Sequence, residues 1–265
     1  MDHGFTERRV IADGFDVRLL EAGSGDPVVY IHAGGGLHLD ESHRLLAEQH
    51  RFLAIELPGY GDSAVNETTQ TFDEMARTLG LVIEAAGIEP PYSLVGTSLG
   101  GACALHVALL HPERIAALVL VAPAAFRPDG WALPPPTEMP GALYAHPERA
   151  AQREPRPTPE LMAKQRRVMD RLLGSLDQQA LRLRLEELDV ATLVVFGTAD
   201  GLIPPQMGRI YREHMPNCSY VLLYDAGHEL GSDRPEAAAG LIDDFLRRRE
   251  AFVIGRGRGL GTVAP

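Results

Sequence analysis

A serine lies at the centre of the motif GTSLG, between the apolar run YSLV and a helical stretch. A serine at such a turn has cramped backbone angles, so its neighbours must be small, and Gly96 and Gly100 meet that need. The turn would lift the Ser98 hydroxyl above a sheet and aim the unpaired N–H groups of the next helix at it. This arrangement suits a nucleophile. A plain strand-to-helix turn, whose glycines serve close packing, is the alternative interpretation.

In this strand–turn–helix context the sequence resembles the α/β-hydrolase family, in which a nucleophile, an acid and a histidine follow one another along the chain, each after a strand. The segment GTAD, which ends in Asp200 and follows the run TLVVF, is similar to the family's acid turn. The segment DAGH, which ends in His228 and follows YVLLY, is similar to its histidine loop. The resemblance covers residues 6 to about 250. It implies a triad of Ser98, Asp200 and His228, with His228 as general base and then acid.

Two carboxylates could orient His228. Asp225 lies only three residues before it on the same loop, whereas Asp200 follows a separate strand, as the family's acid does. The resemblance therefore favours Asp200 over Asp225. A helix cap near Pro204 is the alternative role for Asp200, and a surface loop position is the alternative for His228.

The glycine-rich segment HAGGG follows the apolar run PVVYI and resembles the family's oxyanion loop. The resemblance implies that the backbone N–H groups of Gly34 and Leu99 stabilise a tetrahedral oxyanion. Ala33 stands where the family usually has glycine. A dinucleotide-binding fingerprint is excluded because Leu37 and Leu39 stand where small residues are needed. The segment GYGDSA matches the hydrolases' PGxGxS turn, so we interpret it as structural.

The sequence shows no metal-ligand set. The histidines at positions 32, 38, 43 and 50 include no pair spaced i, i+4, and no cysteine or acid completes a zinc site. Cys103, on the helix after the serine, is predicted to be a small buried side chain. We therefore expect chemistry that needs neither a metal nor an organic cofactor.

Short apolar runs alternate with longer amphipathic segments along the chain, which is typical of a mainly parallel sheet with crossover helices. An Asp13-Gly14 turn joins the first two runs as a β-hairpin. Strands are predicted at residues 6–12, 15–22, 27–31, 52–57, 92–95, 115–121, 192–196 and 220–224. Helices are predicted at residues 37–49, 72–86, 99–110, 206–213 and 235–249.

Residues 124–190 interrupt this alternation. The segment begins proline-rich and ends in a predicted helical stretch, 160–188, between two strands of the sheet. Because that crossover leaves the C-terminal edge of the sheet, where Ser98 would lie, we expect the segment to roof the site. The residues that we expect to contact the substrate are Ala33, His38, Trp131 and Ile203.

The predicted architecture is a single α/β-hydrolase domain, with a mainly parallel eight-stranded sheet and helices on both faces. Residues 1–123 and 191–250 form the core, residues 124–190 form a mostly helical cap, and residues 251–265 form a loose tail.

The composition excludes several classes of protein. The chain has 265 residues and a net charge of −11, and an acidic chain repels nucleic acid and anionic lipid rather than recruiting them. No stretch reaches the ~18 to 20 apolar residues of a membrane span, and the start of the chain lacks the apolar run of a secretion signal. Because the chain has only two cysteines, we expect a cytoplasmic protein whose thiols stay reduced. We also expect it to act on a small molecule and to be a monomer or homodimer.

Together these patterns predict the hydrolysis of a small or medium carboxylic ester through an acyl-enzyme. The serine argues against dehalogenase and epoxide hydrolase chemistry, because those members of the family carry aspartate at this position. Lactone hydrolysis, cofactor-free perhydrolysis and cleavage of a C–C bond next to a carbonyl use the same triad and stay open. Leu37 stands where the C–C hydrolases often have proline. This difference makes the sequence fit C–C bond cleavage less well than ester hydrolysis. A small-molecule receptor with slow turnover, on the same fold, is the alternative outside enzymes.

Overall fold

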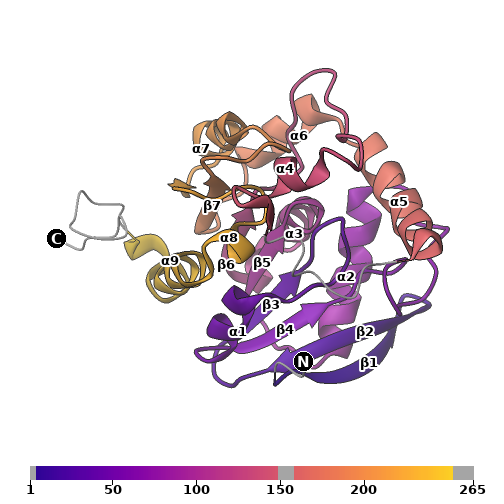
Figure 1. Ribbon diagram of the computed structural model, residues 1–265. Helices are drawn as coiled ribbons and strands as arrows, with labels where there is room; N and C mark the ends of the chain where they lie inside the picture. The colour runs from indigo at the N-terminus through magenta and orange to yellow at the C-terminus, as the bar shows by residue number, and fades with distance from the viewer. Residues whose placement is uncertain (1–3, 149–157, 253–265) are drawn as a thin grey trace.

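The computed structural model describes residues 4–148 and 158–252, which form a central sheet flanked by helices (Figure 1). The strands are β1 Thr6–Ala12, β2 Phe15–Ala22, β3 Pro27–Ile31, β4 Arg51–Ile55, β5 Tyr92–Thr97, β6 Ile115–Val121, β7 Thr192–Gly197 and β8 Cys218–Leu223. They follow the order β1-β2-β4-β3-β5-β6-β7-β8 across one eight-stranded sheet. β2 pairs antiparallel with β1 and with β4, and the other neighbours are parallel. The predicted α/β fold with a mainly parallel eight-stranded sheet is confirmed.

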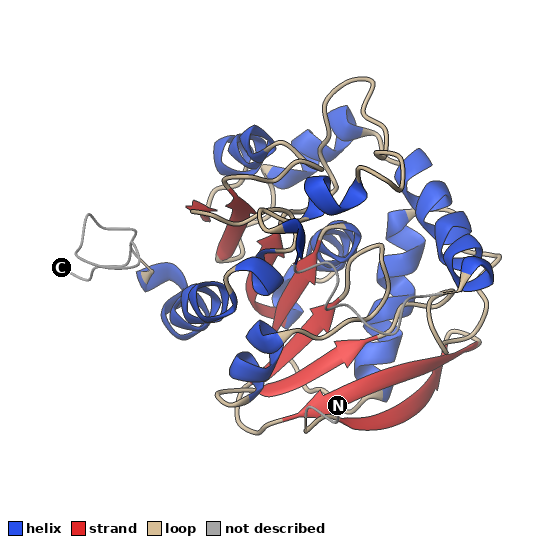
Figure 2. Cartoon of the chain, viewed as in Figure 1, coloured by secondary structure: helices blue, strands red, loops and turns tan. Residues whose placement is uncertain are grey.

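Helices cover both faces of this sheet (Figure 2). They are α1 Glu41–Ala47, α2 Phe72–Ala85, α3 Leu99–Leu110, α4 Met139–Leu143, α5 Pro159–Gly174, α6 Gln178–Leu185, α7 Gly208–His214, α8 Leu230–Asp233 and α9 Pro235–Arg248. The crossover β3-α1-β4 runs in one direction across the sheet, whereas β4-α2-β5, β5-α3-β6 and β7-α7-β8 run in the other. Because such crossovers are right-handed, α1 lies on the face opposite α2, α3 and α7. The direction reverses between β3 and β5, and ligands of open α/β sheets bind at the carboxyl ends of strands at such a point.

The central strands are apolar along almost their whole length because helices cover both of their faces. Every residue of β5 and of β7 is buried. α2 adds an apolar stripe in which Met75, Leu79 and Val82 are fully buried, at the three- and four-residue spacing of a helix face. Complete burial of such a side chain contributes roughly 1.5–3 kcal/mol. This packed core supports the strand ends at which the site lies.

The boundaries of several elements differ from the sequence prediction, and caps and turns explain the differences. The helix predicted at 37–49 is shorter, because the Asp40 carboxylate accepts the N–H group of Ser42 and starts α1 only at Glu41. The stretch predicted at 206–213 begins as a 3-10 turn before α7. β8 begins at Cys218 rather than at residue 220.

The described parts of the segment 124–190, residues 124–148 and 158–190, lie over the carboxyl ends of the strands and contain α4, α5 and α6 (Figure 1). The predicted helical stretch 160–188 is two helices, because Asp177 caps a new start at α6. The sequence reasoning missed α4, which forms within the proline-rich part. Pro140 is compatible with it because the first turn of a helix has no N–H partner to lose.

Two cationic side chains of α5 attach this segment to the core. Lys164 Nζ donates to the carbonyl groups of Gly61 and Ser63 at 3.0 and 2.9 Å. Arg171 Nε donates to the carbonyl group of Thr69 at 3.0 Å. The loop between β4 and α2 therefore holds α5 through hydrogen bonds.

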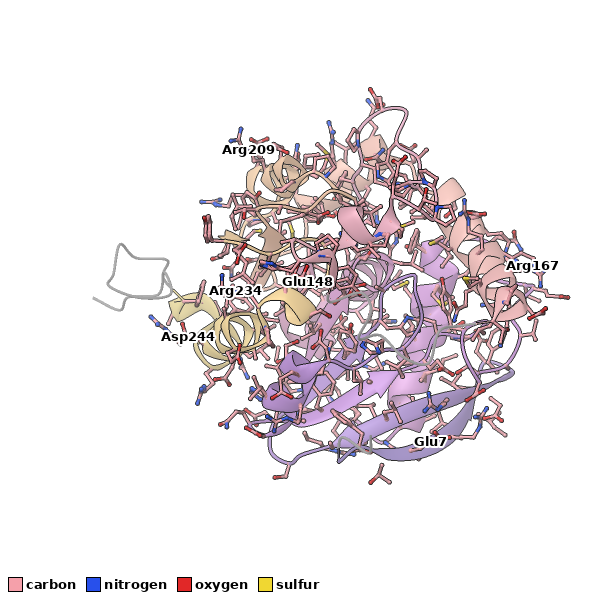
Figure 3. All side chains as sticks on the ribbon, viewed as in Figure 1. Glu7, Glu148, Arg167, Arg209, Arg234 and Asp244 are labelled. Atoms are coloured by element: carbon pink, nitrogen blue, oxygen red, sulfur yellow. The ribbon has the colours of Figure 1, made fainter. Side chains whose placement is uncertain are left out.

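Charged side chains surround the molecule, and Glu7, Arg167 and Arg209 are exposed at its outside (Figure 3). None of the helices in the described ranges has the length and apolar character needed to cross a membrane. Within residues 4–148 and 158–252, no group of three histidine, cysteine or acidic side chains is arranged to hold a metal ion. Most of the predicted tail, residues 253–265, lies outside the described residues.

Candidate active site

Ser98 occupies the sharp turn between β5 and α3. Its backbone angles, φ 54° and ψ −113°, lie in a region that residues other than glycine rarely adopt. Neighbouring backbone holds this conformation: the Ser98 N–H group donates to the carbonyl of Val121 at 2.8 Å, and its own carbonyl accepts from Ala102 and Ala124. The strained turn that the motif predicts is therefore present.

Two glycines make the turn possible for steric reasons. A Cβ atom at Gly96 would lie 2.3 Å from the carbonyl oxygen of Gly100. A Cβ atom at Gly100 would lie 2.2 Å from the carbonyl oxygen of Ile31, at the end of β3. Since real Cβ atoms do not approach so closely, α3 can pack against β3 and β5 only with glycine at both positions.

Asp200, after β7, and His228, after β8, meet at the same edge of the sheet. His228 Nδ1 lies 2.9 Å from Asp200 Oδ2, and both side chains are buried. Asp200 Oδ1 accepts the N–H groups of Leu202 and Ile203, each at 2.9 Å. The carboxylate thus binds the backbone of its own turn as well as the histidine. The 3-10 helix Pro205–Met207 that follows Pro204 has no side-chain cap, so Asp200 does not act as the helix cap given as its alternative role.

Asp225 does not approach His228 in this way. Its Oδ2 lies 3.1 Å from His146 Nε2 and 3.6 Å from Arg234 Nη1, and its side chain is 44% exposed. The structure therefore brings Asp200, and not Asp225, to the histidine.

The environment of His228 prepares it to accept a proton. Burial lowers the pKa of the ring, but the charge and hydrogen bond of Asp200 outweigh burial, with a further contribution from Glu229, and the pKa lies above its ordinary value. Nδ1 carries a proton because it faces a carboxylate. Nε2 is buried and makes no hydrogen bond to the described residues. In the neutral ring, Nε2 is therefore the free acceptor, and His228 lines the same cavity as Ser98.

The predicted oxyanion loop follows β3, and His32 holds it in place. His32 Nε2 accepts the N–H group of Leu57 at 3.0 Å, so Nδ1 bears the proton and donates to the carbonyl of Ala33 at 2.7 Å. The ring is fully buried. Gly34 and Leu99 both line the cavity beside Ser98. The sequence reasoning assigned His32 no role; its place between a strand and a glycine-rich turn is the signal that could have shown one.

The cavity beside Ser98 has a volume of about 540 Å³, within the range of small-molecule pockets. Three of the four residues predicted to contact substrate lie in its wall: Ala33, Trp131 and Ile203. Trp131 Nε1 donates to the carbonyl of Leu202 at 2.8 Å, which ties the ring to the turn after Asp200. Most of the other wall side chains are apolar: Leu133, Met139, Leu143, Met162, Met169, Leu173 and Leu202.

The structure does not bring the fourth predicted residue, His38, to this cavity. His38 lines a much smaller adjoining cavity of about 40 Å³, together with Asp40 and His43, which shares Ala33 and Glu229 with the larger one. The chain turns at Gly36, where φ is 97°, and then leads toward α1.

One face of α5 contributes residues that the sequence reasoning did not single out. Gln165, Arg166, Met169 and Leu173 line the cavity together with Met162. Their spacing of three and four residues is that of one helix face. This spacing, combined with the expected position of the segment over the sheet, is the signal that could have identified them.

Comparison with known proteins agrees with the fold. A family model described as alpha/beta hydrolase fold matches residues 26–153. A pimeloyl-(acyl-carrier protein) methyl ester esterase of Neisseria meningitidis is 32% identical over 215 residues, which cover 73% of this chain and 81% of that protein. A 2-hydroxy-6-oxo-6-(2'-aminophenyl)hexa-2,4-dienoic acid hydrolase of Metapseudomonas resinovorans is 38% identical over 128 residues. That match spans 46% of this chain and less than half of that relative, 44%.

Solved structures share the fold over nearly the whole chain. A 2-hydroxy-6-oxo-6-phenylhexa-2,4-dienoate hydrolase from a Rhodococcus strain superposes with a TM-score of 0.74 at 22% identity, over 92% of this chain and 99% of that one. A thermophilic esterase from Thermogutta terrifontis gives a TM-score of 0.69 at 24% identity, with the same coverage of 92% and 99%. With the sequence relatives above, these matches show that the chain belongs to the α/β-hydrolase family and is a hydrolase.

Proposed function

We propose that this protein is a serine esterase that cleaves small or medium carboxylic esters through an acyl-enzyme. The observation that carries the proposal is the buried Asp200–His228 pair, in which His228 Nε2 makes no hydrogen bond to the described residues and His228 lines the same cavity as the strained Ser98. In this proposal Ser98 is the nucleophile, His228 the general base and then acid, and Asp200 the orienting carboxylate.

The chemistry follows from these positions. Ser98 Oγ attacks the ester carbonyl while His228 Nε2 takes its proton. The N–H groups of Gly34 and Leu99 stabilise the oxyanion of the tetrahedral intermediate, and one such donor typically contributes ~2.7–4 kcal/mol. His228 returns the proton to the departing alcohol, which leaves the acyl group on Ser98. A water molecule repeats the sequence to release the acid. Asp200 stabilises the imidazolium formed in each half and keeps the proton-accepting nitrogen free.

We propose that residues 124–190 act as a cap on a core of residues 1–123 and 191–250. The contacts of Lys164 and Arg171 with the core, and the share of the cavity wall that comes from α4 and α5, support this division. A cap that excludes water lowers the local dielectric and strengthens the interaction of backbone N–H groups with an oxyanion.

The charge of the cavity wall favours an ester over the substrates of the C–C hydrolases. The dienoates named for the relatives carry a carboxylate, and a buried carboxylate needs a cation beside it. Apart from His228, the cation among the described wall residues is Arg166, whose side chain is 54% exposed and pairs with Asp170 at 2.6 Å. Glu229, also in the wall, adds a negative charge. A neutral apolar acyl group fits this wall better.

Cleavage of a C–C bond next to a carbonyl is the second candidate. The observation that favours it is the match of 38% identity to the Metapseudomonas hydrolase. Lactone hydrolysis and cofactor-free perhydrolysis would use the same residues.

We also propose a reducing compartment and a small-molecule substrate for a monomer or homodimer. Cys103 and Cys218 are free and buried, and burial raises the pKa of both thiols. Such cysteines are unreactive and fit the cytoplasm, where thiols stay reduced.

Turnover of p-nitrophenyl esters with acyl chains of two to about ten carbons, beside a 2-hydroxy-6-oxo-dienoate, tests the proposal. We expect ester hydrolysis that is lost by ~10⁴- to 10⁶-fold in Ser98→Ala. A variant that kept a tenth of the activity would exclude Ser98 as nucleophile. Preference for the dienoate would assign the second candidate. Fast labelling of Ser98 by a fluorophosphonate, with negligible turnover of every ester, would indicate a receptor instead.

A further inference from the structure

A buried carboxylate outside the proposed triad joins the histidine loop to the segment 124–190. Asp233, the last residue of α8, is 1% exposed. Its Oδ2 accepts the N–H groups of Gly227 and Ala145, each at 2.8 Å, and its Oδ1 accepts the N–H group of His146 at 3.4 Å. One side chain therefore binds backbone from two distant parts of the sequence. Of the residues labelled in Figure 3, Arg234 directly follows Asp233 and Glu148 lies two residues after His146.

The two backbone segments also contact each other directly. The N–H group of Glu229 donates to the carbonyl of Leu143 at 2.9 Å. A Cβ atom at Gly227 would lie 2.6 Å from the same carbonyl oxygen, so only glycine permits this approach. Both chain neighbours of His228 are therefore held, one by Asp233 and the other by Leu143.

We propose that Asp233 is a positioning residue for His228 and couples this histidine to the cavity wall. The inference rests on the proposed function, because it takes His228 as the catalytic base. Hydrogen bonds from N–H groups to a carboxylate are about twice as strong as neutral ones, and a lost partner leaves buried N–H groups unsatisfied. Leu143 lines the cavity, and its near neighbours Ala145 and His146 bind Asp233. The Asp233 carboxylate thus fixes the position of His228 relative to the apolar wall of the cavity.

Asp233→Asn is the variant that tests the proposal. An amide offers one acceptor oxygen in place of two, and its NH₂ group would face a backbone N–H group, so the histidine loop loses part of its support. We expect kcat for ester hydrolysis to fall on the order of 10- to 100-fold, by analogy with groups that orient a metal-ligating histidine. We expect KM to change as well, because the segment 143–146 borders the cavity.

A second readout does not depend on any ester. Asp200 and Glu229 are the charged groups that raise the pKa of His228, and the larger effect requires the ring to stay against Asp200. NMR titration of the His228 imidazole should therefore give a lower pKa in Asp233→Asn than in the wild type. A residue that served folding alone would lower Tm without moving this pKa.

Glu56→Gln is a matched control. The Glu56 side chain is buried, and its Oε2 accepts the N–H groups of Asp62 and Ser63, each at 2.8 Å. Glu56 follows β4, and four strands separate β4 from β8 in the sheet. We expect a lower Tm in this variant, with an unchanged pKa of His228 and a loss of kcat well below that of Asp233→Asn.

Several outcomes would overturn the proposal. Wild-type kcat and wild-type His228 pKa in Asp233→Asn would do so, as would an equal loss of kcat in Glu56→Gln. If Asp233→Asn does not fold, Gly227→Ala takes its place, because the added methyl group forces residues 143–146 away from the loop. We expect a lower kcat and a lower pKa of His228 in Gly227→Ala as well. Wild-type values of both in this variant would overturn the proposal. A wild-type protein without esterase activity, combined with the NMR shift, would remove the proposed function but keep the link between Asp233 and His228.

Discussion

Asp200→Asn changes one buried group of the proposed triad at nearly constant volume. His228 Nδ1 faces this carboxylate at 2.9 Å, and Oδ1 keeps two backbone N–H partners. If the asparagine oxygen stays with those N–H groups, its NH₂ faces His228 Nδ1. The ring must then place its proton on Nε2, which is the atom that has to accept the proton of Ser98. We expect kcat to fall by about 10⁴, which equals roughly 5.5 kcal/mol of transition-state stabilisation.

Asp225→Asn is the matched comparison for this loss. Asp225 is also an aspartate near the histidine, but its side chain is 44% exposed and contacts His146. Exposed ion pairs contribute only ~0–1 kcal/mol, so kcat should stay within about threefold of the wild type. Initial rates with a p-nitrophenyl ester from pH 5 to 9, with thermal melts of each variant, provide the measurement. The reverse ranking, in folded proteins of similar Tm, would refute the assignment of Asp200.

Three further predictions concern pH, the cap and the turn. In the proposed mechanism the neutral form of His228 is the active one. Its pKa lies above the ordinary ~6.5, so kcat/KM should fall on the acid side with a midpoint above that value; a midpoint below ~6.5 in a pH–rate profile would contradict this. Trp131→Ala should change KM and acyl-chain preference more than Tm, because the ring lines the cavity; a steep loss of Tm with an unchanged substrate ranking would show that Trp131 serves packing alone. Gly100→Ala should destabilise the fold by about 1–3 kcal/mol or more, measured by urea unfolding, because its Cβ would lie 2.2 Å from the carbonyl oxygen of Ile31; a wild-type stability would contradict this steric argument.

The elements around the site were predictable where local chemistry decides them. Asp13 and Gly14 both have positive φ, as a two-residue hairpin turn requires, and Ala12 pairs with Phe15 across it. Ser98 and its flanking glycines form the expected turn for reasons that act within a few residues. Parallel strands then bring Asp200 and His228 to one edge, because the ends of adjacent strands β7 and β8 coincide.

Features that depend on contacts distant in sequence were not predictable. Asp233 reads as an ordinary residue of a short polar stretch, and only the packing of α8 against residues 143–146 shows which N–H groups it binds. The path of the chain after Gly36 decides that His38 leaves the site, and no pattern in the sequence specifies that path. α4 forms in a stretch that its prolines mark as irregular, since its stability comes from neighbours rather than from its own five residues.

The contact of α3 with the end of β3 at Gly100 has a consequence for how this protein can evolve. There the backbone of the serine turn meets the backbone at the end of β3, the strand that leads into the loop of Gly34. This backbone contact fixes where Ser98, the proposed nucleophile, lies relative to the loop of Gly34, the proposed oxyanion donor. In the proposed function, substitutions at wall residues away from these contacts, such as Met139 and Met162, would change which acyl groups enter and leave this backbone contact intact. Under the proposed function, new substrate preferences can thus accumulate one wall residue at a time.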